Sequence, residues 1–192
     1  MKTDSITKMS LDTETADATA LISESEQHSI VIDRATLADW NQIWPFFQQI
    51  VSARETYGLD PNWTKLDAFD QWFAPDKTVY VACKGDTVAG TYYIRPNGHG
   101  PAVHVANAGF MVNPSFQGQG IGRLMGEHAL EEAKRLKYKS MQFNRVVASN
   151  QSALRLWESL GFQVIGTTPK GFNHVSQGFV DTHIMYRSLE DS

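Results

Sequence analysis

HVANAGFMVNPSFQGQGIGR, residues 104–123, begins like a buried strand, but Asn107 and Gly109 interrupt its apolar run. A glycine inside a strand usually marks a bulge or a place where another main chain comes close. The second half of the stretch carries the alternating glycines Gly118, Gly120 and Gly122 and runs into a helical pattern. It therefore predicts an irregular strand, a glycine loop and a helix start, in that order.

The flanking segments alternate between strand and helix patterns. A strand is predicted at 29–34, a helix capped by Thr36, a helix at 65–73, and a hairpin of two strands that turns at Gly85-Asp86. Pro45 falls inside the first helical pattern and is expected to kink or split that helix. After the opening stretch we expect a helix at 118–137, a strand at 140–147, a helix at 150–160 and strands at 162–168 and 178–187. This order predicts an α/β sandwich around a mixed sheet.

Length and charge favour one domain behind an acidic tail. Residues 1–28 carry two lysines and six acidic residues, a net charge of −4 that equals the charge of the whole chain of 192 residues. They are also poor in large apolar residues, so we expect residues 1–28 to be a flexible acidic tail. Residues 29–192 are expected to form the domain.

The near-neutral domain excludes several classes of partner. It has no basic run for nucleic acid, no stretch of about 18 apolar residues for a membrane and no signal peptide, so a cytoplasmic protein is predicted. The single cysteine, Cys83, excludes an internal disulfide and a cysteine-based zinc site. His99 and His104 lack metal-ligand spacing, and we expect structural or surface roles for them and no metal.

The glycine loop departs from two nucleotide-binding signatures. The third glycine of the G-x-G-x-x-G fingerprint is missing, and no Gly-Lys-Ser/Thr ending follows. Glycines at a helix start can still cradle a phosphate, because their N–H groups and the positive end of the helix point to one place. From these residues alone, a phosphate cradle and a plain tight turn both remain open.

Two motifs resemble those of the Gcn5-related N-acetyltransferase (GNAT) superfamily. VNPSFQGQGIGRLM resembles its motif A through Gln117, Gly120 and Gly122, and NQSALRLWESLGF (150–162) resembles its next motif. The resemblance spans residues 29–187. It implies an acetyl-CoA-dependent N-acetyltransferase with a three-layer sandwich around a mixed, mostly antiparallel sheet that is splayed at the centre.

A narrower resemblance rests on HVANAGFMVNP, MQFNRVVASN and GFNHVSQGFVDTHIMYR. These segments are similar to enzymes that acetylate L-azetidine-2-carboxylate and related proline analogues. The resemblance implies a small-molecule amine as the partner, proline-analogue detoxification as the role, and a homodimer as the assembly.

The resemblance also implies where acetyl-CoA, the co-substrate, would lie. Backbone N–H groups of Phe110, Met111 and Val112 would bind the pantetheine arm. These N–H groups would also polarise the thioester carbonyl, and Phe110 is the catalytic residue among the three. The diphosphate would be held at the loop and helix start, by Gln117, Gly118, Gln119, Gly120, Ile121, Gly122 and Arg123.

The implied chemistry is direct attack of the amine on the thioester, without an acyl-enzyme. The sequence departs from the superfamily at two points, because no acidic residue lies between His99 and Gln119 and Trp157 replaces the usual tyrosine. We therefore expect the side-chain amide of Asn150, which also touches the coenzyme, to stabilise the leaving thiolate, and water to remove the amine proton. The alternatives are that Asn150 only caps a helix and that Trp157 only packs.

For the acceptor, the resemblance assigns Asn107 to the substrate carboxylate, together with backbone N–H groups of Asn144 and Arg145. The alternative for Asn107 is a bulge residue that bonds its own backbone. The aromatic residues of 57–73 either line the acceptor pocket or pack in the core: Tyr57, Trp63, Trp72 and Phe73.

Two other functions stay open from the sequence. The acceptor could be a primary amine, such as an amino acid, a polyamine or a protein N-terminus. The missing glutamate and tyrosine would also fit an acyl-CoA-binding module without catalysis.

Overall fold

The computed structural model describes residues 29–190, and the expected acidic tail at 1–28 lies outside that range. The described chain forms one seven-stranded sheet in the order β1-β2-β3-β4-β5-β7-β6. Its strands are β1 (Ile30–Arg34), β2 (Thr78–Lys84), β3 (Thr87–Pro96), β4 (Val105–Val112), β5 (Ser140–Val147), β6 (Gln163–His174) and β7 (Gly178–Ser188).

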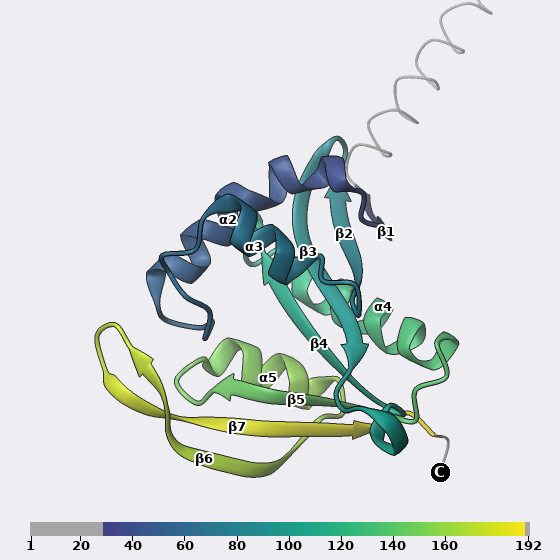
Figure 1. Cartoon of the computed structure of the whole chain (residues 1–192), viewed down its shortest axis with the longest axis vertical. Helices are drawn as coiled ribbons and strands as arrows, with labels where there is room; N and C mark the ends of the chain where they lie inside the picture. Colours follow the sequence, from purple (N-terminus) through teal and green to yellow (C-terminus); the bar gives the residue numbers. More distant parts are fainter. Residues whose placement is uncertain (1–28, 191–192) are drawn as a thin grey trace, which may run out of the picture.

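Helices cover both faces of this sheet (Figure 1). They are η1 (Leu37–Asp39), α2 (Trp40–Ala53), α3 (Lys65–Trp72), η2 (Gly100–Ala102), η3 (Pro114–Phe116), α4 (Ile121–Arg135) and α5 (Gln151–Ser159). One apolar core lies between the sheet and α2 and α3, and the other lies between the sheet and α4 and α5. The expected three-layer sandwich is therefore confirmed. Within residues 29–190, no helix is long and apolar enough to cross a membrane.

The sheet splits at its centre, where its one parallel pair lies. β4 and β5 pair only at Val105↔Ser140 and Ala106↔Met141, whereas the other neighbouring strands of the described sheet pair antiparallel over longer stretches. Beyond Ala106 the two strands diverge (Figure 1). The expected mixed, mostly antiparallel and splayed sheet is confirmed.

Pro45 does not split the first helix, and a kink there, the other expected outcome, stays a prediction. α2 runs from Trp40 to Ala53 as a single helix that contains Pro45. A proline removes one N–H donor, and its ring disturbs the preceding turn. Here Pro45 is on the exposed side of the helix, while the opposite side is buried against the sheet and holds the helix together: Trp40, Ile43, Phe46, Phe47 and Val51.

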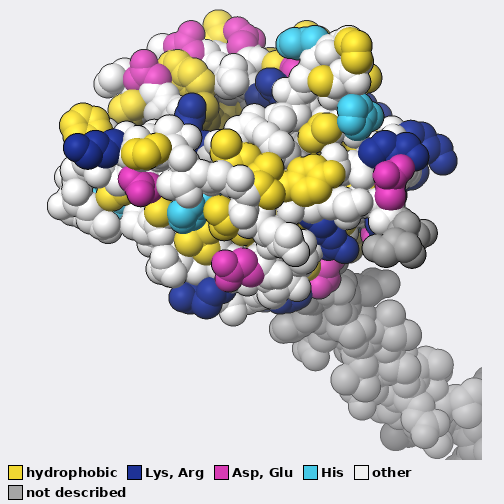
Figure 2. Space-filling model, turned by 90° about the horizontal axis from the view of Figure 1, so that it is seen from below, with side chains coloured by type: hydrophobic (Ala, Val, Ile, Leu, Met, Phe, Trp, Pro, Cys, Tyr) yellow, Lys and Arg dark blue, Asp and Glu magenta, His cyan; other side chains and the backbone are white. Residues whose placement is uncertain are grey.

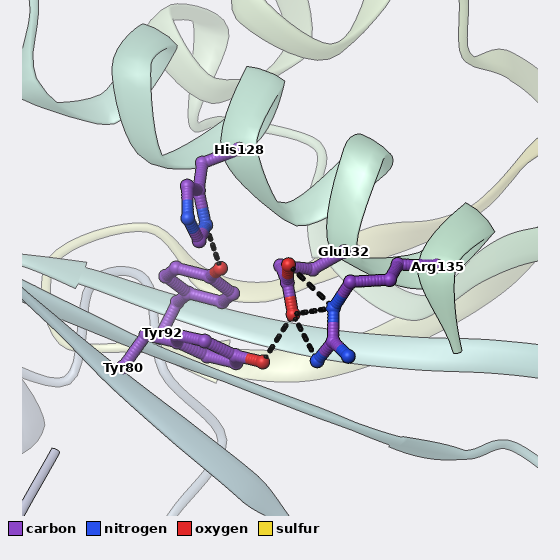
Figure 3. A network of polar contacts seen from close by, with 5 residues as sticks. All are labelled: Tyr80, Tyr92, His128, Glu132 and Arg135. Carbon is purple, nitrogen blue, oxygen red and sulfur yellow. Dashed lines mark hydrogen bonds and ion pairs between the residues drawn. The ribbon is translucent and has the colours of Figure 1, made fainter. Parts of the chain in front are cut away.

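α4 is anchored to the sheet by a polar network of five residues (Figure 3). The stacked rings of Tyr80 and Tyr92 lie under the helix, with centroids 4.8 Å apart. Tyr92 hydrogen-bonds His128, and the Tyr80 hydroxyl donates to Glu132 at 2.7 Å. Arg135 donates to the same carboxylate at 2.8 Å, and these bonds lower the pKa of Glu132 to about 2. The network fixes the direction of the helix whose first residues follow the glycine loop.

The other end of the sheet exposes apolar side chains. β6 is an edge strand, and Val164 and Ile165 on it and Phe179 on β7 are exposed. Figure 2 shows hydrophobic side chains gathered on the face seen from below. An exposed apolar edge of this kind is a common place for contact with another chain.

Candidate active site

The gap between β4 and β5 opens into a cleft of about 750 Å³. Its walls are the two strands, the loop after α2, the glycine loop and the start of α5. The cleft brings together most of the residues expected at the site: Asn107, Phe110, Met111, Val112, Gln117, Gly118, Gly120, Ile121, Gly122, Asn144, Arg145 and Asn150. Gln119 and Arg123 are not among its lining residues.

The free edge of β4 presents every second main-chain group to the cleft. Asn97 N–H donates to Val105, and Asn113 N–H donates to Ala89, so the odd-numbered residues of β4 face β3. Because hydrogen bonding alternates along an antiparallel pair, Phe110 and Val112 turn their N–H groups toward the gap.

Met111 differs from its expected role for the same reason. It was expected to bind the pantetheine arm with its N–H group, but that group faces Thr91 of β3. Its side chain is buried in the core under α2 and α3. Phe110 and Val112 therefore remain as the main-chain donors of this segment.

The glycine loop presents a second set of free donors. Gly118 and Gly120 have φ angles of 75° and 78°, which is the left-handed region that favours glycine. A Cβ at either position would meet no atom within 4 Å, so the space beside the loop is open. Within residues 29–190, the N–H groups of 118–120 have no hydrogen-bond acceptor. The loop and the start of α4 thus form a concave set of donors for an anion.

Three residues of this segment have other contacts. The Gln117 N–H group donates to Pro114 at 3.3 Å. Gln119 accepts a hydrogen bond from Lys84 at 3.0 Å. Arg123 donates to Ser159 at 2.6 Å and also contacts Glu127. The Gln119 and Arg123 side chains contact residues outside the cleft lining, whereas Gln117 lines the cleft. The expected contact of all three with the coenzyme stays a prediction.

Tyr57 lines the cleft, in line with one of the two interpretations of the aromatic residues at 57–73. Its hydroxyl accepts a hydrogen bond from the Phe110 N–H group, and burial raises the pKa of that hydroxyl well above its usual value. Gly109 makes room for it, because a Cβ there would lie 2.9 Å from the Tyr57 hydroxyl and 2.6 Å from the Tyr93 ring. Gly109 was the one sequence signal of this close approach. It marks side-chain crowding as well as the splay.

Asn150 caps α5 and still has a free donor. Its Oδ1 accepts from the Ala153 N–H group at 3.2 Å and from the Ser152 hydroxyl at 2.9 Å. The Nδ2 group has no acceptor within the described chain, and the residue lines the cleft. The cap and the expected hydrogen bond to a thiolate therefore use different atoms of one side chain.

Asn107 lies where β4 and β5 begin to separate. Its Nδ2 group donates to the backbone oxygen of Gln142 on β5 at 2.9 Å. This bond ties the two strands together directly after their last ladder pair. One proton of the amide is thus already used, and only the second is available for the expected contact with a substrate carboxylate.

Asn144 and Arg145 interrupt the ladder between β5 and β7. The register shifts between Phe143 and Val146, which leaves both residues outside the pairing. The Asn144 side chain donates to Asn97 at 2.6 Å. Their backbone N–H groups thus lie at an irregularity of the ladder, and the acceptor role that was expected of them stays a prediction.

The cleft carries little charge. Among the described residues that line it, Arg145 is the single charged one, and none of them carries a carboxylate or an imidazole. Trp157 packs between Phe110 and Phe143, with ring centroids 4.8 Å and 4.7 Å away, as its packing interpretation predicted. Cys83 lies outside the cleft. No cluster of metal-ligating side chains occurs within residues 29–190.

Comparison with known proteins agrees with this geometry. Residues 38–162 match the Acetyltransferase (GNAT) family. N-acetyltransferase aca1 of Schizosaccharomyces pombe is 32% identical over 167 residues, which cover 77% of this chain and 80% of that protein. The chain belongs to the GNAT family. It is an N-acetyltransferase that depends on acetyl-CoA, and the open edge of β4 and the glycine loop fit the arm and the diphosphate of that molecule.

Solved structures show the same fold. A GCN5-related N-acetyltransferase from Kribbella flavida superimposes with a TM-score of 0.80 at 42% identity, over 83% of this chain and 97% of that chain. The Salmonella typhimurium protein yncA, solved with acetyl-CoA, has a TM-score of 0.72 at 22% identity, over 85% of this chain and 96% of that chain. The [ribosomal protein bS18]-alanine N-acetyltransferase of Salmonella typhimurium is 36% identical over 74 residues, which cover 38% of this chain and 49% of that protein.

Proposed function

We propose that the protein transfers the acetyl group of acetyl-CoA to a small cyclic secondary amino acid, a proline analogue such as L-azetidine-2-carboxylate. The proposal includes detoxification of that compound in the cytoplasm. The observation that carries it is the composition of the cleft: among the described residues that line it, there is one arginine and no acidic side chain, and Asn144 and Arg145 lie outside the regular β5–β7 pairing. Such a surface suits an acceptor that carries a carboxylate, and it offers nothing to balance the charge of a polyamine.

Each end of the cleft has its own task in this proposal. The N–H groups of 118–120 and the start of α4 hold the diphosphate. The N–H groups of Phe110 and Val112 hold the arm. The Phe110 N–H group also polarises the thioester carbonyl, which replaces the Tyr57 hydroxyl as its hydrogen-bond acceptor. When bound, acetyl-CoA supplies an activated acyl group and a thiolate leaving group.

The chain's own residues account for the rest of the transfer. The Asn150 Nδ2 group donates to the departing sulfur and stabilises its negative charge. The amine proton passes to water, because none of the lining residues within 29–190 carries a carboxylate or an imidazole. With Cys83 outside the cleft, the amine attacks the thioester directly and no acyl-enzyme forms.

A thiol-release assay with purified protein and acetyl-CoA tests the proposal. The acceptors are azetidine-2-carboxylate, proline analogues, primary amino acids, spermidine and a peptide with an N-terminal alanine. We expect the highest kcat/KM for the cyclic secondary amino acids. Preference for the peptide would favour the primary-amine alternative, to which the partial match with an alanine N-acetyltransferase points. Binding of acetyl-CoA without release for any amine would favour a non-catalytic module.

The homodimer also stays a prediction. The exposed apolar residues Val164 and Ile165 on the edge strand β6 support it, since such an edge can pair with a second copy. Light scattering at several protein concentrations would show a dimer mass if it is right and a monomer mass if it is wrong.

A further inference from the structure

We infer that the Arg145 side chain is the specificity determinant of the acceptor site: its guanidinium pairs with the acceptor carboxylate, so the protein selects amino acids over their uncharged amides. This inference rests on the proposed function. It goes beyond it by assigning recognition to a side chain and not only to backbone N–H groups.

The first support is the isolation of this charge. Arg145 lines the cleft and is exposed, and none of the ion pairs formed within residues 29–190 includes it. The arginines of the described chain that do pair with a carboxylate do not line the cleft: Arg95, Arg123 and Arg135. An arginine that pairs with no carboxylate of the described chain, in a cleft whose described lining has no acidic residue, offers its hydrogen-bond donors to a ligand that enters.

The second support is the contact that holds the side chain in place. A Cβ on Gly58 would lie 3.1 Å from Nη1 and 3.4 Å from Cδ of Arg145. The side chain therefore reaches from β5 across to the loop after α2 and lies against the main chain there. This position is next in sequence to Tyr57, whose hydroxyl bonds the Phe110 N–H group. The guanidinium thus lies against the loop after α2, next to Tyr57 in the cleft lining.

The third support is the chemistry of the pair. A guanidinium stays charged at any physiological pH and matches a carboxylate with two parallel hydrogen bonds. The neighbouring N–H groups of Asn144 and Arg145, which lie at the register shift between β5 and β7, would add neutral donors to the same anion. A carboxamide offers one neutral oxygen in place of two charged ones, so it should bind less tightly.

The experiment measures an amino acid and its carboxamide as acceptors for the unchanged protein, for variants of Arg145 and for a control variant of Arg155. Arg145→Gln removes the charge, and Arg145→Lys keeps the charge but loses the planar fork. Arg155→Gln is the control, because Arg155 is exposed on α5 and does not line the cleft. KM and kcat are measured for azetidine-2-carboxylate and azetidine-2-carboxamide, and KM is measured for acetyl-CoA.

We expect Arg145→Gln to raise KM for the acid by about 10- to 150-fold, the size of a lost hydrogen bond to a charged group. KM for the amide and for acetyl-CoA should change little, so the preference for the acid collapses. Arg145→Lys should give an intermediate value, and Arg155→Gln should behave like the unchanged protein. An unaltered ratio of acid to amide in Arg145→Gln would overturn the inference, and so would a loss confined to acetyl-CoA.

A binding measurement separates this inference from the proposed function. Calorimetric titration of azetidine-2-carboxylate into the protein with CoA requires no turnover. If the unchanged protein releases no thiol with any amine, the proposed function fails. If the unchanged protein still binds the acid and Arg145→Gln does not, the result would support Arg145 as the anion site. Equal binding in the two proteins, or no binding in either, would overturn the inference.

Discussion

Asn150→Asp separates the two roles of this side chain without changing its shape. Oδ1 still caps α5 at the Ala153 N–H group, and aspartate is as good a cap as asparagine. The free Nδ2 donor becomes a carboxylate oxygen. A hydrogen bond to a charged group contributes about 1.5–3 kcal/mol. If that bond forms to the departing thiolate, its loss lowers kcat by about 10- to 150-fold, and repulsion between the two negative charges adds to the effect.

The assay is steady-state thiol release beside thermal unfolding. Asn150→Asp should keep its melting temperature and lose kcat. Asn150→Ala should lose both, because a missing cap costs about 1 kcal/mol of stability. Turnover that stays unchanged in Asn150→Asp would refute the catalytic role and leave the cap as the whole explanation for this asparagine.

Three further changes test other parts of the structure. Gly109→Ala should lower stability by about 1–3 kcal/mol and reduce activity, because the new methyl overlaps the two tyrosine side chains beside it; unchanged unfolding in urea would contradict the described packing. Gly120→Ala should raise KM for acetyl-CoA through strain at its positive φ, whereas Gly85→Ala, with the same kind of strain in a hairpin turn, should leave that KM unchanged. Glu132→Gln should make the stability of the folded chain less sensitive to acid. The pKa of Glu132 is about 2 in the folded chain, so its contribution to stability is complete above pH 4.5 and is lost as the pH falls toward 2. Equal pH profiles of the urea midpoint in the variant and the unchanged protein would count against the network.

Local features of the site followed from short stretches of sequence. The glycines before α4, the asparagine cap of α5 and the hairpin turn at Gly85 each depend on the backbone preferences of a few adjacent residues. The order of strands and helices followed from apolar periodicity in the same way. Even the absence of an acidic residue near the reacting strand was visible in the sequence.

Partners distant in sequence could not be predicted in this way. Tyr57 meets the Phe110 N–H group, and Arg145 meets Gly58, because the loop after α2 folds over the gap between β4 and β5. The register of β3 and β4 decided that Met111 turns its N–H group away from the gap.

The sequence by itself determined the family, the order of elements and the turns that open the coenzyme site, since each of these depends on residues close together in the chain. Only the tertiary structure decided which main-chain donors stay free and which side chains face the acceptor. Those outcomes depend on strand pairing and burial across the whole sheet. If the pairing of a strand shifts by one residue, the main-chain groups that faced the neighbouring strand face the cleft instead.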